Sequence, residues 1–268
     1  MNFKEVNYIT KSDIFKNELS WIVDDKTREF AEKAINMLPD YFFTVAASST
    51  GKYHSKYALG AGGLVRHVKA CAKFAHELLG LEQNNTFTQK EKDLMITAII
   101  LHDGWKHGSE GSAFTVAEHP TLCADWIRNN SELNSMLDPN DLEILCGAIA
   151  SHMGQWTTDY KSKKEILPKP QTEIQKWVHI FDYLGSRKWI EVDFEDDYYD
   201  GSYKAVSEVD NTIASIITEC KAKIADGVSR DNIYEAIQEV AGVKNPNKIT
   251  DNMVAIAVLD KIKELCVG

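Results

Sequence analysis

Long apolar runs are missing from this chain of 268 residues. The longest, around MITAIIL and MVAIAVL, are far shorter than the roughly 20 apolar residues that a membrane-spanning helix needs. The first segment, MNFKEVNYITKSDIF, carries acidic residues where a secretory signal would have an unbroken apolar run. Since 44% of the residues are apolar, the chain can still build a sizeable core. We expect a soluble, cytoplasmic protein without a membrane partner.

The sequence also lacks any CxxC pair. Its five cysteines are odd in number and far apart, at positions 71, 123, 146, 220 and 266. Neither a disulfide framework nor a thiolate zinc site is therefore predicted. This cysteine usage fits a reducing compartment.

Positive charge is scarce, with 30 Lys and Arg against 40 Asp and Glu and a net charge of −10. Proteins that bind duplex DNA need a large basic surface, so no duplex nucleic acid is expected as a partner. Residues 41–76 nevertheless contain no Asp or Glu, and they include Lys52, Lys56, Arg66, Lys69 and Lys73. We interpret this acid-free stretch as a local surface that attracts anions. Within it, Lys69 and Lys73 are expected to coat a solvated helix face.

No hairpin of alternating polar and apolar residues is evident, because apolar residues recur at intervals of three and four. This pattern predicts an all-α fold. Helices are expected at 25–38, 63–79, 89–102, 118–128, 140–152 and 173–189, and again at 203–225, after 231 and after 250. We divide the chain into an N-terminal helical segment (1–40), a main helical domain (41–197) and a helical C-terminal subdomain (198–268) that packs or mediates self-association.

Six potential metal ligands fall at inward positions on these expected helices. They are His67, His102, Asp103, His119, His152 and Asp182. A single histidine on an apolar face is usually structural, but the core of a helical bundle is where such a set can converge on metal. A buried carboxylate without a cation would be costly. Four imidazoles and two carboxylates suffice for two divalent ions, and they suit iron, manganese, cobalt or nickel better than zinc or magnesium.

At these positions the sequence resembles the HD-domain superfamily of metal-dependent phosphohydrolases. The resemblance covers roughly residues 53–189. It is carried by the segments GGLVRH (62–67), LHDGWK (101–106), EHP (118–120), SHMG (151–154) and DYLGSRK (182–188). Gly104 and Trp105 stand where the family more often has Ile and Gly. The resemblance implies that residues 41–197 form an HD-domain helical bundle.

The resemblance also implies roles for the six ligands. Asp103 would bridge two divalent ions. One ion would be held by His67, His102 and Asp182, and the other by His119 and His152. A hydroxide between the ions would then hydrolyse a phosphate ester or anhydride bond in a nucleotide-like small molecule. Its catalytic residues would be Asp103 and Lys106, with Lys106 holding a phosphate oxygen.

Four further residues are candidates for contacts with this small anionic, phosphate-bearing substrate. Lys52 and His54 lie in the acid-free stretch, although a plain solvated turn explains them equally well. Arg66 directly precedes the potential metal ligand His67. Arg187 lies about one and a half helical turns after Asp182. Either arginine could instead pair with a surface acid.

The six ligands alone leave other functions open. One alternative is a nuclease or phosphodiesterase acting on short or cyclic oligonucleotides, although this would favour a longer basic groove with aromatic residues. A second is a mixed-valent di-iron oxygenase, because inositol oxygenase and a phosphonate-cleaving enzyme resemble the same six-ligand pattern. A third is a binding module on a degenerate scaffold, which would usually have lost its metal ligands.

Overall fold

The computed structural model describes residues 10–48, 51–109, 111–159, 162–203 and 208–266. Within these ranges the chain forms eleven α-helices and six short 3-10 helices, and no β-strand. A single isolated bridge joins Thr158 to Glu165. The predicted all-α fold is confirmed. None of the helices in the described ranges is long and apolar enough to cross a membrane.

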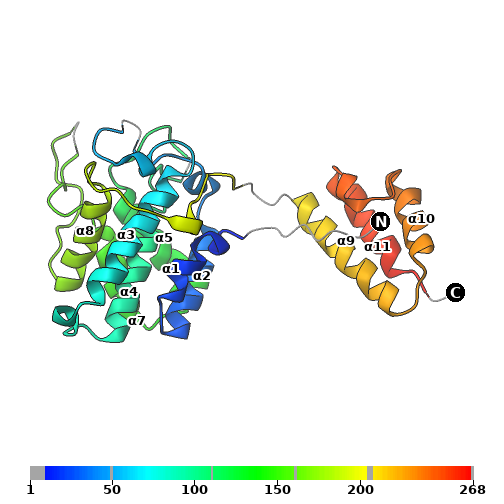
Figure 1. Cartoon of the computed structure of the whole chain (residues 1–268), viewed down its shortest axis with the longest axis horizontal. Coiled ribbons are helices and arrows are strands. Elements are labelled where there is room, and N and C mark those ends of the chain that lie inside the picture. The colour runs from blue at the N-terminus through cyan, green and yellow to red at the C-terminus, as the bar shows by residue number, and fades with distance from the viewer. Residues whose placement is uncertain (1–9, 49–50, 110, 160–161, 204–207, 267–268) are drawn as a thin grey trace. The chain divides into compact units, whose positions relative to one another are not determined.

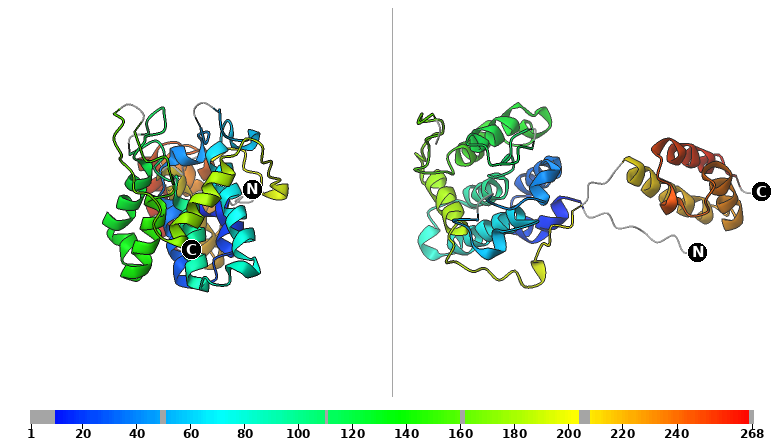
Figure 2. Two further views of the ribbon diagram at one scale, coloured as in Figure 1. Left: turned by 90° about the vertical axis from the view of Figure 1, so that its left-hand side faces the viewer. Right: turned by 90° about the horizontal axis from the view of Figure 1, so that it is seen from above.

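The chain divides into two compact units, of which the first spans residues 9–203. Its α-helices are α1 (Lys16–Ser20), α2 (Asp25–Met37), α3 (Gly63–Leu79), α4 (Gln89–Leu101), α5 (His119–Asn129), α6 (Ser131–Asn134), α7 (Pro139–Ala150) and α8 (Glu173–Gly185). Its 3-10 helices are η1 (Ser12–Phe15), η2 (Asp40–Phe43), η3 (Lys56–Ala58), η4 (Glu82–Asn84) and η5 (Glu195–Asp197). Helix α3 packs against α4 and α8, and α7 packs against α4, α5 and α8 (Figures 1 and 2).

Local sequence signals explain where two of these helices begin. Thr88 and Glu91 form a reciprocal capping box at the start of α4, and Thr172 and Gln175 form another at the start of α8. Both spacings can be read in the sequence, because Thr followed three residues later by Glu or Gln is typical of a helix start. Helix α8 ends at Gly185, however, and Trp189, expected to continue its inward stripe, is 76% exposed. The predicted extension of this helix was wrong.

A glycine allows α3 and α8 to approach closely. A Cβ atom on Gly185 would lie 2.2 Å from Sγ of Cys71 and 3.3 Å from the ring of His67. Any larger residue at this position would therefore push the two helices apart. This close contact brings His67 on α3 near Asp182 on α8.

Lys69 on α3 is buried rather than solvated. Its Nζ atom lies 3.1 Å from Oε2 of Glu18 and 2.6 Å from Oδ2 of Asp197, so two carboxylates compensate for its burial. Burial raises the pKa of Glu18 to about 7, although Lys69 opposes this shift. The expectation that Lys69 coats a solvated face was wrong, and the acid-free stretch contributes one fewer lysine to the surface.

We expect the substitution Lys69→Met to destabilise the protein by about 3–5 kcal/mol at pH 8, because it leaves the buried carboxylate of Glu18 and the partly buried one of Asp197 without their cation. The pKa of Glu18 in the folded protein lies above its ordinary value of 4.5. The contribution of protonated Glu18 to the free energy of unfolding is therefore fully present below pH 4.5 and is lost as the pH rises through about 7. The penalty should therefore be smaller at pH 5. Urea unfolding at both pH values measures it.

Lys73→Met provides the matched control, since Lys73 lies one turn further along α3. Its Nζ atom donates a hydrogen bond only to the exposed backbone carbonyl of Asp193, at 3.1 Å. We expect this variant to lose less than about 1 kcal/mol at either pH. Equal losses in the two variants would contradict the importance of the buried ion pairs.

The second unit comprises residues 1–8 and 204–268, and its described residues form α9 (Glu208–Ala225), α10 (Arg230–Ala241), η6 (Pro246–Lys248) and α11 (Asn252–Lys263). These helices have their own apolar core, which includes Ile216, Cys220, Ile237 and Val258. The boundary predicted at residue 198 falls a few residues before the end of the first unit at Tyr203.

Candidate metal centre

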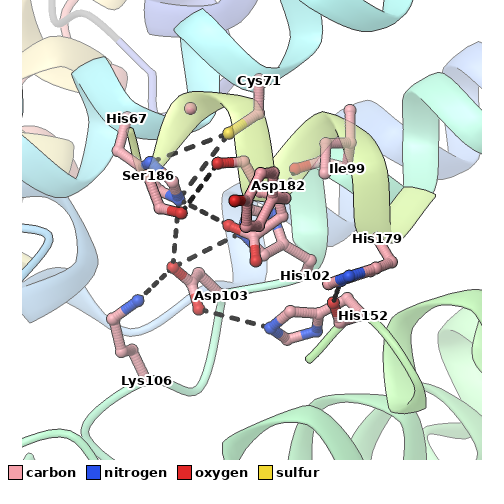
Figure 3. Close-up of polar contacts among 12 residues, drawn as sticks. His67, Cys71, Ile99, His102, Asp103, Lys106, His152, His179, Asp182 and Ser186 are labelled. Atoms are coloured by element: carbon pink, nitrogen blue, oxygen red, sulfur yellow. Dashed lines mark hydrogen bonds and ion pairs between the residues drawn. The ribbon is translucent and has the colours of Figure 1, made fainter. Parts of the chain in front are cut away.

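Six side chains from five segments converge inside the first unit, and Figure 3 labels all of them except His119. They come from α3 (His67), the turn directly after α4 (His102 and Asp103), the start of α5 (His119), the turn after α7 (His152) and α8 (Asp182). Five of them are almost completely buried, and the side chain of Asp182 is 16% exposed. Within this set, ligand atoms form groups of three that lie within 4.8 Å of one another. The sequence-predicted ligands are thus brought together in one place.

Asp103 faces two sets of histidines with its two oxygens. Oδ2 lies 3.4 Å from Nε2 of His102 and 3.7 Å from Nε2 of His67. Oδ1 lies 3.1 Å from Nε2 of His119 and 3.9 Å from Nε2 of His152. His119 and His152 are themselves neighbours, with their Nε2 atoms 3.3 Å apart. A carboxylate in this position can contact two cations at once, each through its own oxygen.

Asp182 supplies a second carboxylate to the His67 and His102 side of the cluster. Its Oδ1 lies 3.1 Å from Nε2 of His67 and 3.5 Å from Nε2 of His102. Cys71 also lies here, with Sγ 3.7 Å from both ring nitrogens of His67. His67, Cys71 and Asp182 therefore form a further group that could hold a metal ion.

Three of the histidines are oriented by their own backbone. In each, Nδ1 donates a hydrogen bond to the carbonyl three residues earlier, at 2.6 Å in His102 and at 2.8 Å in His119 and His152. Because a carbonyl only accepts, Nδ1 carries the proton, and the Nε2 lone pair points into the cluster. Burial also lowers the pKa of His152 to about 3. Its imidazole is therefore neutral, which is the form that binds metal.

The charges of the cluster fit a bound cation. Among the described residues, Nε2 of His102 and Oδ1 of Asp103 are buried polar atoms without a hydrogen-bond partner, which is costly unless a cation satisfies them. Burial lowers the pKa of His102, but the carboxylates of Asp103 and Asp182 outweigh it and raise this pKa to about 10, so a ring without bound metal takes up a proton at Nε2, the position that a metal ion would otherwise occupy. Burial likewise raises the pKa of Asp103, but Lys106 and His102 hold it well below its usual value. The cluster thus favours positive charge, and these residues could hold a metal ion.

A cavity of about 530 Å³ opens onto the cluster. Asp103, His119, His152 and Asp182 line it, and Lys106 lies beside them. The Nζ atom of Lys106 forms an ion pair with Oδ2 of Asp103 (Figure 3). Cavities of this volume accommodate small-molecule ligands. A small molecule can therefore reach the cluster, where Lys106 supplies a positive charge.

Two of the four residues expected to contact substrate line this cavity. His54 packs edge-on against His67, with ring centroids 5.0 Å apart, and its buried Nδ1 has no hydrogen-bond partner. Burial lowers the pKa of His54 to about 3, so this ring is neutral. Arg187 lies in the wall of the same cavity, where its guanidinium stacks on the ring of Tyr183.

The other two residues, Lys52 and Arg66, lie outside the cavity lining. The buried guanidinium of Arg66 donates hydrogen bonds to the backbone carbonyls of Tyr57, Leu59 and Tyr199. These hydrogen bonds hold the segment around Tyr199 against the region before α3. The expected contact of Arg66 with substrate is not supported, because these carbonyls occupy its donors.

Three residues near the cluster went unrecognised in the sequence. Cys71 follows His67 by four residues, which on a helix places both on one face. Trp156 follows His152 by the same interval, but the chain turns between them, so helical spacing does not apply. Tyr183 is adjacent to Asp182, and neighbouring residues of a helix do not share a face. Of these three residues, only Cys71 could have been identified from its spacing in the sequence.

Comparisons of the chain with protein-family models, curated proteins and solved structures found no match. The chemistry of the site therefore rests on its own side chains. These are buried imidazoles and carboxylates that could hold a metal ion, next to a lysine and an open cavity.

Proposed function

We propose that this protein is a metal-dependent hydrolase of phosphate ester or anhydride bonds, of the HD-domain type. The observation that carries the proposal is the position of Asp103. Its two oxygens face two separate sets of imidazoles, and Lys106 lies at the open side of the same carboxylate. A single metal would need only one of these sets.

Two divalent ions would divide the six ligands between them. His67, His102 and Asp182 would hold one ion, His119 and His152 the other, and Asp103 both. Two such ions supply an activated water at neutral pH and neutralise phosphoryl oxygens. Imidazole with carboxylate ligands favours iron, manganese, cobalt or nickel.

The chain's own residues supply the rest of the proposed chemistry. Lys106 would bind a phosphate oxygen at the metal end of the cavity, where charge grows during displacement of the leaving group. Arg187 would add a second positive group further along the wall. These two cations would make the cavity locally attractive to an anionic substrate, which the net charge of −10 otherwise repels.

The proposal is tested by assaying phosphate release and oxygen consumption side by side. The protein is loaded with Mn²⁺ or Fe²⁺ and incubated with a panel of nucleotides, with and without oxygen. We expect metal-dependent phosphate release that does not require oxygen, and no release after treatment with a chelator. Oxygen consumption without phosphate release would overturn the proposal and favour a di-iron oxygenase.

A further inference from the structure

The wall of the cavity carries a stack of two aromatic rings and a guanidinium. The rings of Trp156 and Tyr183 are parallel within 8°, with centroids 5.9 Å apart. Cζ of Arg187 lies 3.9 Å from the centroid of Tyr183. All three side chains line the cavity that reaches Asp103 and Lys106.

Both rings keep exposed surface while they line the cavity. Trp156 is 47% exposed and Tyr183 is 36% exposed, although tryptophan is highly buried on average in folded proteins. The cavity holds about 530 Å³, which is much more space than a phosphate group fills. The exposed surfaces of Trp156 and Tyr183 therefore border the part of the cavity that a phosphate group bound near Lys106 would not fill.

The position of Trp156 is fixed relative to the cluster. Gly154 has a φ of +64°, and a Cβ atom there would lie 2.2 Å from the ring of His179. Nδ1 of His179 donates a hydrogen bond to the backbone carbonyl of His152 at 2.7 Å, and the Trp156 indole packs edge-on against His179 at 5.9 Å. The same turn thus positions the candidate metal ligand His152 and the exposed indole.

We propose that Trp156, supported by Tyr183 and Arg187, is a stacking platform for a planar ring of the substrate. The resemblance already implies a nucleotide-like substrate, and the platform adds the residues that would hold its base. Every nucleobase has a π-face that stacks on an aromatic side chain, and Arg187 adds a cation to the stack. The inference rests on the proposed function, because Lys106 and the cluster define the phosphate end of the cavity.

Calorimetric binding to the full-length, metal-loaded protein tests the platform without turnover. The ligands are the 5′-phosphonates of the four common ribonucleosides and ribose 5-phosphonate, which differ only in the base. We expect at least one nucleoside phosphonate to bind at least about fivefold more tightly than ribose 5-phosphonate. Trp156→Leu should abolish that ratio, whereas Trp156→Phe should keep most of it, because phenylalanine also stacks.

Trp189→Leu is the matched control, because Trp189 is exposed and does not line the cavity. It should retain the wild-type ratio. Equal affinity for all five ligands, no binding of any of them, or an unchanged ratio in Trp156→Leu would overturn the platform. Because phosphonates are not hydrolysed, this outcome is independent of phosphate release. Failure of the platform is thus distinguishable from failure of the proposed hydrolase.

Discussion

Replacing Asp103 with asparagine is expected to lower phosphate release by at least about 10³-fold while the protein stays folded. The substitution preserves the shape of the side chain but removes the charge that faces both sets of imidazoles. Binding of both proposed ions should weaken together, because Asp103 would help to hold each of them. Metal content after dialysis and the initial rate of phosphate release measure the two effects.

Asp93→Asn is the matched control for this substitution. Asp93 is also a fully buried carboxylate on α4, but it accepts hydrogen bonds from the backbone N–H of Asp24 and the side chain of Gln89, away from the cluster. We expect Asp93→Asn to cost stability without changing metal content. Wild-type activity and metal content in Asp103→Asn would refute the bridging role.

Lys106→Ala is expected to lower kcat by about 10²–10³-fold with little change in bound metal. The reason is that a cation held beside the cluster can stabilise the negative charge that develops on the phosphoryl group in the transition state. Lys106 also neutralises Asp103, as their ion pair indicates. If that were its only role, the substitution would change metal binding and leave kcat per bound metal unaltered.

Lys52→Ala serves as the comparison for Lys106→Ala. Lys52 lies outside the cavity lining, so it can assist only the capture of an anionic substrate. Its effect should appear in KM and fade as the salt concentration rises, because salt screens exposed charges. A kinetically silent Lys106→Ala with unchanged metal occupancy would contradict the phosphohydrolase assignment and favour the oxygenase.

Much of the fold was predictable because its signals are local. Thr88 and Thr172 each stand three residues before a Glu or Gln, and both form the expected caps. The six ligands were recognisable because a polar residue on an apolar helical stripe stands out at short range. The structure adds that their helices also meet in space.

Other features depend on partners that are distant in the sequence. Lys69 was misjudged because its two carboxylates, Glu18 and Asp197, lie 51 and 128 residues away. One of the carbonyl partners of Arg66 is equally distant, since it belongs to Tyr199. Periodicity shows that a basic residue lies on a helix, but not whether a distant acid covers it.

The most direct test of the account is to locate the ions. Crystals of the protein reconstituted with Mn²⁺ would be measured for anomalous scattering at the manganese absorption edge. We predict two peaks, one next to His67, His102 and Asp182 and one next to His119 and His152, with Asp103 in contact with both. A single peak, or peaks away from these six side chains, would contradict the binuclear centre on which the proposed hydrolysis depends.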